Sequence, residues 1–251
     1  MDKIEELACI IKSSKHITFF GGAGVSTESN IPDFRSPTGL YNAKQRVPSL
    51  KNTPYTSEEL ISHTFFVNHT DLFFDYYFDS LMYPDALPNY AHKFLSLLEK
   101  NNLLDAIVTQ NIDGLHQVAG SKNVLELHGC VKRNYCTKCN AFYNDIEIVK
   151  YHAKCPKCGA IIKPDVVLYE EALDYDIIEK AIYYISHADT LIIGGTSLVV
   201  YPAAAFVKYF RGNNLVIINK EKTPMDSYAT LCINDSIGEV FKKVNDILKL
   251  E

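Results

Sequence analysis

Short, mostly apolar runs alternate along the chain with segments in which apolar residues recur every three or four positions. The short runs have the length and the β-forming residues of buried strands, and they occupy residues 16–20, 106–109, 124–127, 190–193 and 215–218. The periodic segments predict amphipathic helices at residues 2–14, 174–187, 201–210 and 236–249. This alternation predicts an α/β fold with a parallel sheet covered by helices on both faces.

Two regions interrupt the alternation. The first begins with residues 36–56, a predicted loop rich in Pro, Ser, Thr and Asn, after which Thr56 and Glu59 form the capping-box pattern that starts a helix. It continues through residues 57–83, whose many aromatic side chains we interpret as a helical core or the wall of a groove. The second region, residues 130–164, is polar and rich in cysteine, and it predicts an insert in the sheet.

Two further elements complete the pattern. Asn89 is expected to cap a helix whose apolar face carries Phe94, Leu97 and Leu98. Beyond the cysteine-rich insert, the strand pattern resumes at Val166–Leu168.

Composition and charge place the chain among globular proteins. Its 251 residues are 47 % hydrophobic and 22 % charged, which suits one domain with a substantial insert. A net charge of −5 gives no overall attraction to nucleic acid or to an anionic membrane. The acidic N-terminus does not resemble a secretion signal, and the apolar runs are too short to span a bilayer. We therefore expect a cytoplasmic protein with neither nucleic acid nor membrane as partner, and a monomer is favoured.

Four of the seven cysteines form two Cys-x-x-Cys pairs that are separated by fifteen residues. In a reducing compartment such pairs are more often metal ligands than disulfides. Four thiolates close a tetrahedral site with no open position, which predicts a structural zinc ion bound by Cys136, Cys139, Cys155 and Cys158. Free thiols and an iron centre are the alternatives. Nearby basic residues leave a nucleic-acid-binding zinc ribbon open as the minor alternative, and we interpret them first as solvated charges that offset the thiolates.

A glycine turn and a polar loop follow the first predicted strand. The small residues of Gly21–Ser26 let a backbone approach a pyrophosphate, and their amides supply hydrogen-bond donors. The motif is not a full Gly-x-Gly-x-x-Gly, so an ordinary tight turn is the alternative. In the loop Ile31–Ser36, Arg35 could contact phosphate and Phe34 could shield a reactive centre from water. An ordinary surface loop would carry the same residues.

Polar residues also follow two later strands, at the sheet edge where open α/β folds bind ligands. Thr109–His116 offers amide and carboxylate groups that suit a carboxamide or ribose hydroxyls, or simply the caps of a strand-to-helix turn. His128, between Leu127 and Gly129, could act as a general base in its neutral form. A structural histidine is the alternative.

Together, these elements resemble the sirtuin family of NAD-dependent protein deacylases, in a prokaryotic-type, single-domain form. The similarity extends from about residue 4 to residue 245. It rests on the glycine turn with its Pro-Asp-Phe-Arg loop, Thr-Gln-Asn-Ile-Asp-Gly-Leu-His, His-Gly, both Cys-x-x-Cys pairs, Gly195–Leu198, Tyr201–Ala204 and Ile218–Asn219.

The resemblance implies a domain organisation and a set of site residues. A Rossmann-like NAD-binding domain would comprise residues 1–40, 84–129 and 165–251, and a small domain would comprise a helical part, 41–83, and a zinc-binding part, 130–164. The residues implied to be catalytic are His128, Asn111 and Asp113. Those implied to contact NAD are Gly22, Ala23, Thr27, Phe34, Arg35, Gln110, Ile112, Asp113, His128, Gly195, Thr196, Ser197, Asn219, Lys220 and Ile237. Val166, Val167 and Leu168 match the segment that pairs with a substrate peptide as an added strand.

The family chemistry implied for this chain consumes NAD. The acyl oxygen of the modified lysine attacks the nicotinamide ribose carbon, and nicotinamide leaves. His128 then removes a proton from a ribose hydroxyl, and the products are free lysine, nicotinamide and acyl-ADP-ribose. The implied enzyme is an NAD-dependent protein-lysine deacylase of the transferase or hydrolase class, acting on acetylated proteins or peptides. The zinc ion takes no part in this chemistry.

Two positions depart from the family pattern. Asn30 stands where the family usually has Gly, but Asn tolerates a left-handed backbone, so we expect the loop to be intact. Tyr169-Glu170-Glu171 stands where an aromatic-Gly-Glu sequence is usual, which puts the fine peptide specificity in question.

The acyl preference can also be inferred. Members that favour succinyl or malonyl groups carry a Tyr-x-x-Arg pair. Here the residue three positions after Tyr76 is Asp79, and the residue three positions after Tyr77 is Ser80. We therefore predict neutral acyl groups, acetyl first, with longer apolar chains as an alternative.

Other functions compatible with parts of the pattern are a protein mono-ADP-ribosyltransferase and a non-catalytic NAD-sensing or zinc-dependent interaction module. The presence of Asn111, Asp113 and His128 together argues against a pure binding module.

Overall fold

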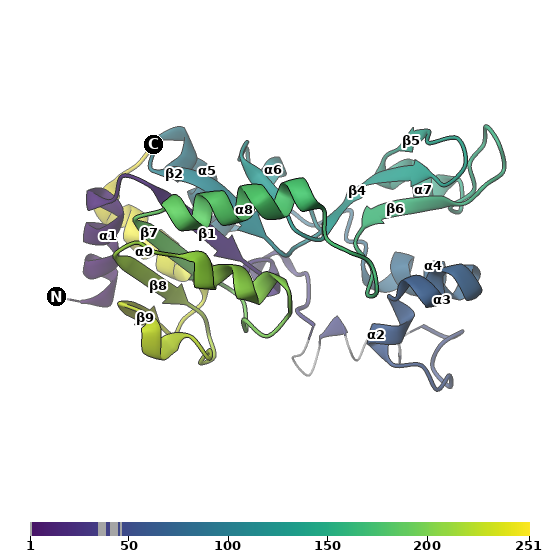
Figure 1. The fold of residues 1–251 in the computed structure, drawn as a ribbon, viewed down its shortest axis with the longest axis horizontal. Coiled ribbons are helices and arrows are strands. Elements are labelled where there is room, and N and C mark those ends of the chain that lie inside the picture. Colours follow the sequence, from purple (N-terminus) through teal and green to yellow (C-terminus); the bar gives the residue numbers. More distant parts are fainter. Residues whose placement is uncertain (1, 35–38, 41–44, 46) are drawn as a thin grey trace.

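The computed structural model describes residues 2–34, 39–40, 45 and 47–251, which form two parts (Figure 1). The larger part contains a six-stranded parallel sheet with the order β3-β2-β1-β7-β8-β9. Its strands are β1 (Ile17–Gly21), β2 (Leu104–Thr109), β3 (Val124–Glu126), β7 (Thr190–Gly194), β8 (Asn214–Ile218) and β9 (Leu231–Ile233). The order reverses between β1 and β7, and this arrangement confirms the predicted Rossmann-like sheet.

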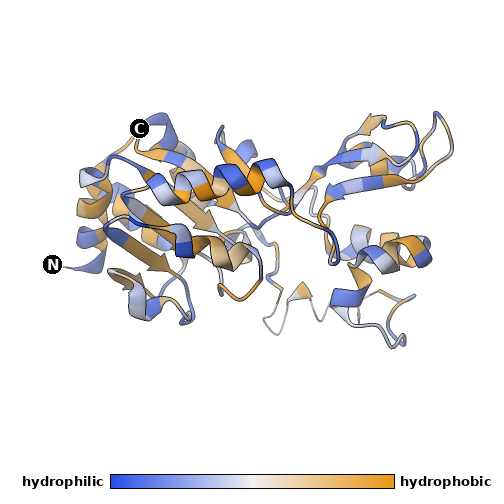
Figure 2. Ribbon diagram, viewed as in Figure 1, coloured by the Kyte–Doolittle hydropathy of each residue, from blue (hydrophilic) through white to orange (hydrophobic). Residues whose placement is uncertain are grey.

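Helices cover both faces of this sheet, because successive strand residues point to opposite sides. Phe19 and Ile107 pack with one group of helices, α1 (Lys3–Ser13), α5 (Tyr90–Lys100) and α9 (Ile237–Leu248). Phe20 and Val108 pack with α8 (Tyr175–His187) and the 3-10 helix η4 (Ala203–Tyr209) on the opposite face. Figure 2 shows the largely hydrophobic strands that this double layer encloses.

The smaller part has its own hydrophobic core. An antiparallel sheet of order β5-β4-β6 packs with helices around buried aromatic side chains that include Phe73, Phe74, Tyr76 and Tyr77. The predicted helical core of aromatic residues is therefore confirmed. Its elements are α2 (Ser57–Leu60), α3 (His63–Asn68), α4 (Thr70–Ser80), β4 (Gly129–Cys136), β5 (Phe142–Tyr143), α7 (Asp145–Lys150) and β6 (Ile162–Val166). Thr56 begins α2 with the expected capping box, and Asn89 caps α5.

Two predicted elements need correction. The strand expected at Val166–Leu168 is β6, which ends at Val166 and runs antiparallel to β4 in the small sheet. The Val167 amide still bonds to the His128 carbonyl, beside the start of β4, but the Leu168 amide bonds to the Glu171 carboxylate, and the chain leaves the sheet there. The helix expected at residues 201–210 is a 3-10 helix, since apolar spacing does not distinguish i→i+3 from i→i+4 hydrogen bonding.

Among the described residues, no helix combines the length and the apolar character that crossing a bilayer requires.

Candidate active site and metal centre

A cavity of about 780 Å³ lies where the carboxyl ends of the parallel strands face the small part. Strand-order reversals in open α/β sheets create such ligand-binding crevices. The cavity brings together the predicted site residues that the structure describes, apart from the four cysteines. They are Gly22, Ala23, Thr27, Phe34, Gln110, Asn111, Ile112, Asp113, His128, Val166, Val167, Leu168, Gly195, Thr196, Ser197, Asn219, Lys220 and Ile237. Arg35 lies outside the described residues.

The glycine turn after β1 packs directly against the end of β7. The Gly24 amide donates to the Gly195 carbonyl at 2.8 Å, and the Gly22 amide donates to the Gly194 carbonyl at 3.2 Å. A Cβ added to Gly24 would lie 2.7 Å from the Gly195 Cα atom, and Gly195 itself has φ +59°. Side chains are therefore excluded where the glycine turn packs on the end of β7, at the point where the strand order reverses.

Ser26 joins the two polar residues that follow β2. Its hydroxyl donates to Asp113 Oδ2 at 2.6 Å and accepts from Asn111 Nδ2 at 3.0 Å. Asp113 Oδ1 also accepts from the Leu115 amide at 2.8 Å, so both of its oxygens are held. Asn111 and Asp113 are thus fixed in orientation before any ligand binds, as a site for ribose hydroxyls or a carboxamide requires. Ser26 was not among the predicted site residues, although it lies in the glycine turn that the sequence singles out.

His128 has a defined proton arrangement. Its Nδ1 atom lies 2.9 Å from the Gln110 carbonyl oxygen, which can only accept, so Nδ1 carries the ring proton. The Nε2 atom is then the basic nitrogen. Burial lowers the pKa of His128 below its usual value and outweighs the opposing effect of the Gln110 hydrogen bond. The imidazole is therefore neutral at pH 7 and can accept a proton at Nε2.

Backbone contacts tie the small part to both ends of this site. The Val167 amide donates to the His128 carbonyl at 3.0 Å, and the Val131 amide donates to the Ile112 carbonyl at 2.9 Å. On the other side, Gln110 Nε2 donates to Thr196 Oγ1 at 3.1 Å and joins β2 to the loop after β7. Both parts of the chain therefore fix the surroundings of His128.

Apolar residues of the small part line the cavity beyond the strand ends. They were not predicted because they come from separate segments with no shared motif, and they include Leu40, Ile61, Leu81, Met82 and Val131.

The four predicted metal ligands form one cluster in which all the sulfur atoms lie within 4.8 Å of one another. The Cys136 and Cys158 sulfurs are 3.4 Å apart, and those of Cys139 and Cys155 are 3.6 Å apart. Four sulfurs at the usual Zn–S distance would be about 3.8 Å apart in a tetrahedron. The donor set and its spacing therefore fit a structural zinc ion.

The two residues that depart from the family pattern, Asn30 and Glu170, both have a positive φ angle. Asn30 has φ 62° and ψ 22°, the left-handed conformation expected of an Asn in a position that favours Gly. Glu170 has φ 75°, which is uncommon for a residue with a side chain. The backbone is therefore compatible with Gly at both positions, although neither residue is Gly.

Comparisons with known proteins agree on one family. The model of the Sir2 family matches residues 22–202. A protein named NAD-dependent protein deacetylase from Clostridium perfringens is 59 % identical, over 98 % of this chain and 99 % of its own length. A protein with the same name from Clostridium acetobutylicum is 56 % identical, over 97 % of this chain and 98 % of its own length.

Solved structures give the same result. A Sir2 variant with a deacetylated p53 peptide and 3′-O-acetyl ADP-ribose has a TM-score of 0.87 and 36 % identity, with full coverage of both chains. A complex of Sir2 with a p53 peptide and NAD has a TM-score of 0.84 and 35 % identity, with 99 % coverage of both.

Proposed function

The chain belongs to the Sir2 family, and we propose that it is an NAD-dependent protein deacetylase that removes acetyl groups from lysine side chains. The observation that carries this function is the neutral, partly buried His128 in a cavity shared with Asn111, Asp113 and the glycine turn. Its substrates are acetylated proteins or peptides. A monomer is the form that we propose.

The catalytic roles follow from the hydrogen bonds of the site. NAD, once bound, supplies the ribose carbon that the acyl oxygen attacks and the nicotinamide that leaves. Asn111 and Asp113, held by Ser26, would orient the nicotinamide ribose. His128 would accept the proton of a ribose hydroxyl at Nε2, because its Nδ1 proton is committed to the Gln110 carbonyl. Phe34, which lines the cavity, would exclude water during this exchange.

The two parts of the chain would have different roles in the reaction. We propose that residues 1–40, 84–129 and 165–251 form the NAD-binding domain, and that residues 41–83 and 130–164 form the small domain. The cysteine cluster holds a structural zinc ion, which would stabilise β4 and β6 beside His128 without entering the chemistry. Val166–Leu168 would form one wall of the peptide site.

The function is tested by measuring nicotinamide release from NAD with and without an acetyl-lysine peptide. We expect release to require the peptide and to be matched by free lysine and acetyl-ADP-ribose. Transfer of label from NAD onto protein would favour an ADP-ribosyltransferase instead. Binding of NAD without any release would leave only a binding module.

We expect neutral acyl groups to be preferred. Tyr76 and Tyr77 are buried in the small core, and Asp79 occupies the position where an arginine countercharge would be needed. The cavity does contain Lys132, but its Nζ atom already pairs with Asp145 at 3.2 Å. Bringing an unpaired carboxylate into this site should make desuccinylation at least about tenfold slower than deacetylation.

Initial rates on otherwise identical acetyl-, propionyl- and succinyl-lysine peptides measure this preference, with propionyl as the size control. If the propionyl rate is close to the acetyl rate, the slower removal of succinyl groups results from their charge and not from their size. A succinyl rate above the acetyl rate would refute the expectation.

The pH dependence of the reaction should reflect the lowered pKa of His128. Because burial lowers the pKa of His128 below its usual 6.5, the neutral base predominates at pH 7 and above. We expect kcat/KM to be independent of pH there and to fall only below pH 6.5, as the imidazole becomes protonated. Rate profiles between pH 5 and 9 in a constant-ionic-strength buffer test this. A fall that begins above pH 7 would contradict a depressed pKa.

A further inference from the structure

The turn after β6, residues 167–171, borders the cavity and connects two walls of it. Val167 donates its amide to the His128 carbonyl at 3.0 Å. Two residues later, Tyr169 pairs with the segment before α3, since its amide donates to the Ile61 carbonyl and its carbonyl accepts from the His63 amide, both at 3.0 Å. The turn is therefore fixed at one end to the catalytic histidine and at the other to the helical part of the small domain.

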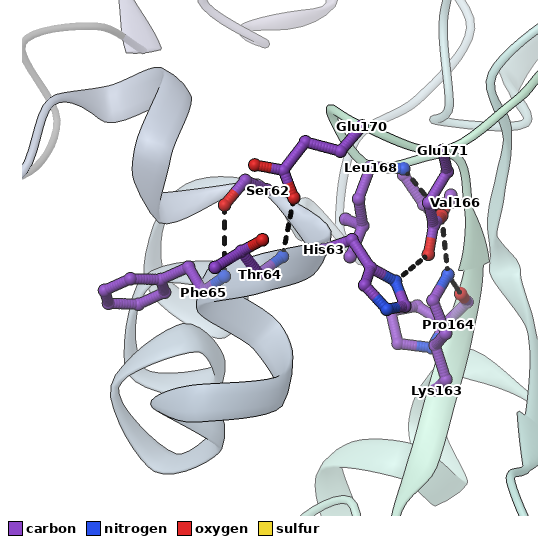
Figure 3. A network of polar contacts seen from close by, with 10 residues as sticks. All are labelled: Ser62, His63, Thr64, Phe65, Lys163, Pro164, Val166, Leu168, Glu170 and Glu171. Carbon is purple, nitrogen blue, oxygen red and sulfur yellow. Dashed lines mark hydrogen bonds and ion pairs between the residues drawn. The ribbon is translucent and has the colours of Figure 1, made fainter.

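Glu170 extends from this turn to the N-terminus of α3 (Figure 3). Its Oε2 atom accepts from the Thr64 amide at 2.8 Å, across 106 residues of sequence. The Thr64 hydroxyl and amide lower the pKa of Glu170 below its usual value, so the side chain is ionised at neutral pH. This contact restricts the side chain of an otherwise exposed residue to one position at the rim of the cavity.

The neighbouring Glu171 differs from Glu170 in its partners. Glu171 accepts from Lys163 Nζ at 3.1 Å and contacts His63 Nδ1 at 2.9 Å, so a lysine offsets its charge. The ion pairs of the described residues include none for Glu170, whose recorded partner Thr64 is neutral. The charge of the nearby His63 also lowers the pKa of Glu170, but through no hydrogen bond or ion pair. The turn therefore presents one fixed carboxylate that pairs with no lysine or arginine of the described residues.

The charges of the surrounding cavity do not offset this carboxylate. Among the described lining residues, acidic side chains outnumber basic ones. The basic ones, apart from His128, are Lys132 and Lys220. Lys132 is already paired with Asp145. A peptide that lies along the turn would thus meet an uncompensated negative charge at Glu170.

We propose that Glu170 is a specificity-determining residue, which favours substrates with a lysine or arginine within three positions of the acetyl-lysine. Glu170 lies in the same turn as Val167, whose amide bonds to the His128 carbonyl, and both residues line the cavity. A cation near the reacting lysine can therefore reach the carboxylate. Because Thr64 already holds the carboxylate, pairing does not require that side chain to be ordered again. The inference rests on the proposed deacetylase function.

The test compares three acetyl-lysine peptides of equal length whose flanking residues are arginine, glutamine or glutamate. For the wild type at low salt we expect kcat/KM to be about fivefold higher with the arginine peptide than with the glutamate peptide, as for exposed charges. Glu170→Gln keeps an oxygen that can accept from Thr64 but removes the charge, so this ratio should fall to about one. Glu170→Lys should invert it.

Two controls separate charge at this position from charge in general. Asp246→Asn removes an exposed carboxylate from α9, outside the cavity, and should keep the wild-type ratio. Raising the salt concentration should reduce the wild-type ratio toward one, and this measurement needs no variant.

Equal rates of the wild type on all three peptides, or an unchanged ratio in Glu170→Gln, would overturn the inference. Failure of the wild type to deacetylate any of the peptides would overturn the deacetylase function itself, and this inference with it.

Discussion

His128→Ala should lower the deacetylation kcat by about two to four orders of magnitude, which is the usual contribution of a positioned general base. The substitution removes the Nε2 atom that would accept the ribose proton. Because this proton transfer follows the departure of nicotinamide, the earlier step should survive. We therefore expect peptide-dependent exchange of labelled nicotinamide into NAD to persist while acetyl-ADP-ribose formation is lost.

A matched histidine serves as the control. His187 is exposed at the end of α8, outside the cavity, and His187→Ala should leave both rates near wild type. The affinity of His128→Ala for NAD, measured by calorimetry, should stay within a few-fold of wild type. Equal loss of exchange and deacetylation, with NAD affinity intact, would show that His128 acts earlier than proposed.

The sheet could be predicted because its central strands are buried on both faces. Runs such as Leu191–Ile193 and Leu215–Ile218 are apolar throughout, and turn signals bound them. The edge strand β9 (Leu231–Ile233) was missed, although the equally short strand at the other edge, β3, was predicted. The end of β6 was misplaced because Val167 and Leu168 are as apolar as strand residues, whereas the Leu168 amide bonds to the Glu171 carboxylate of the following turn.

The site residues could be selected by motif, but their partners could not. Asn111 and Asp113 stand out in the sequence, whereas the hydroxyl that orients both comes from Ser26, 85 and 87 residues away. Likewise, a glutamate at position 170 could be seen as a departure from a glycine pattern. Its contact with Thr64 could not be foreseen, because it depends on how the helical part folds back onto the turn. Local patterns therefore identify the reacting groups, and long-range packing decides how they are held.

Removal of zinc should also strongly lower both stability and activity, although the metal takes no part in the reaction. Structural zinc sites contribute about 10–16 kcal/mol of apparent binding free energy at pH 7 in isolated zinc-finger peptides, which matches or exceeds the usual stability of a domain. Cys155→Ser, or treatment of the wild type with a strong chelator, should therefore unfold the small sheet. The loss should be visible as a lowered Tm and a metal content near zero by mass spectrometry.

Activity should be lost when the small sheet unfolds, because both of its long strands adjoin the catalytic histidine. Strand β4 begins at the residue after His128, and β6 is followed by Val167, whose amide donates to the His128 carbonyl. Cys9→Ser is the matched control, since Cys9 is an exposed thiol on α1, outside the metal cluster, and should change neither zinc content nor rate. A metal-free protein that deacetylates at the wild-type rate would show that the small sheet holds His128 without zinc. The position of the catalytic base would then depend on the backbone contacts of Val167 and Val131 alone.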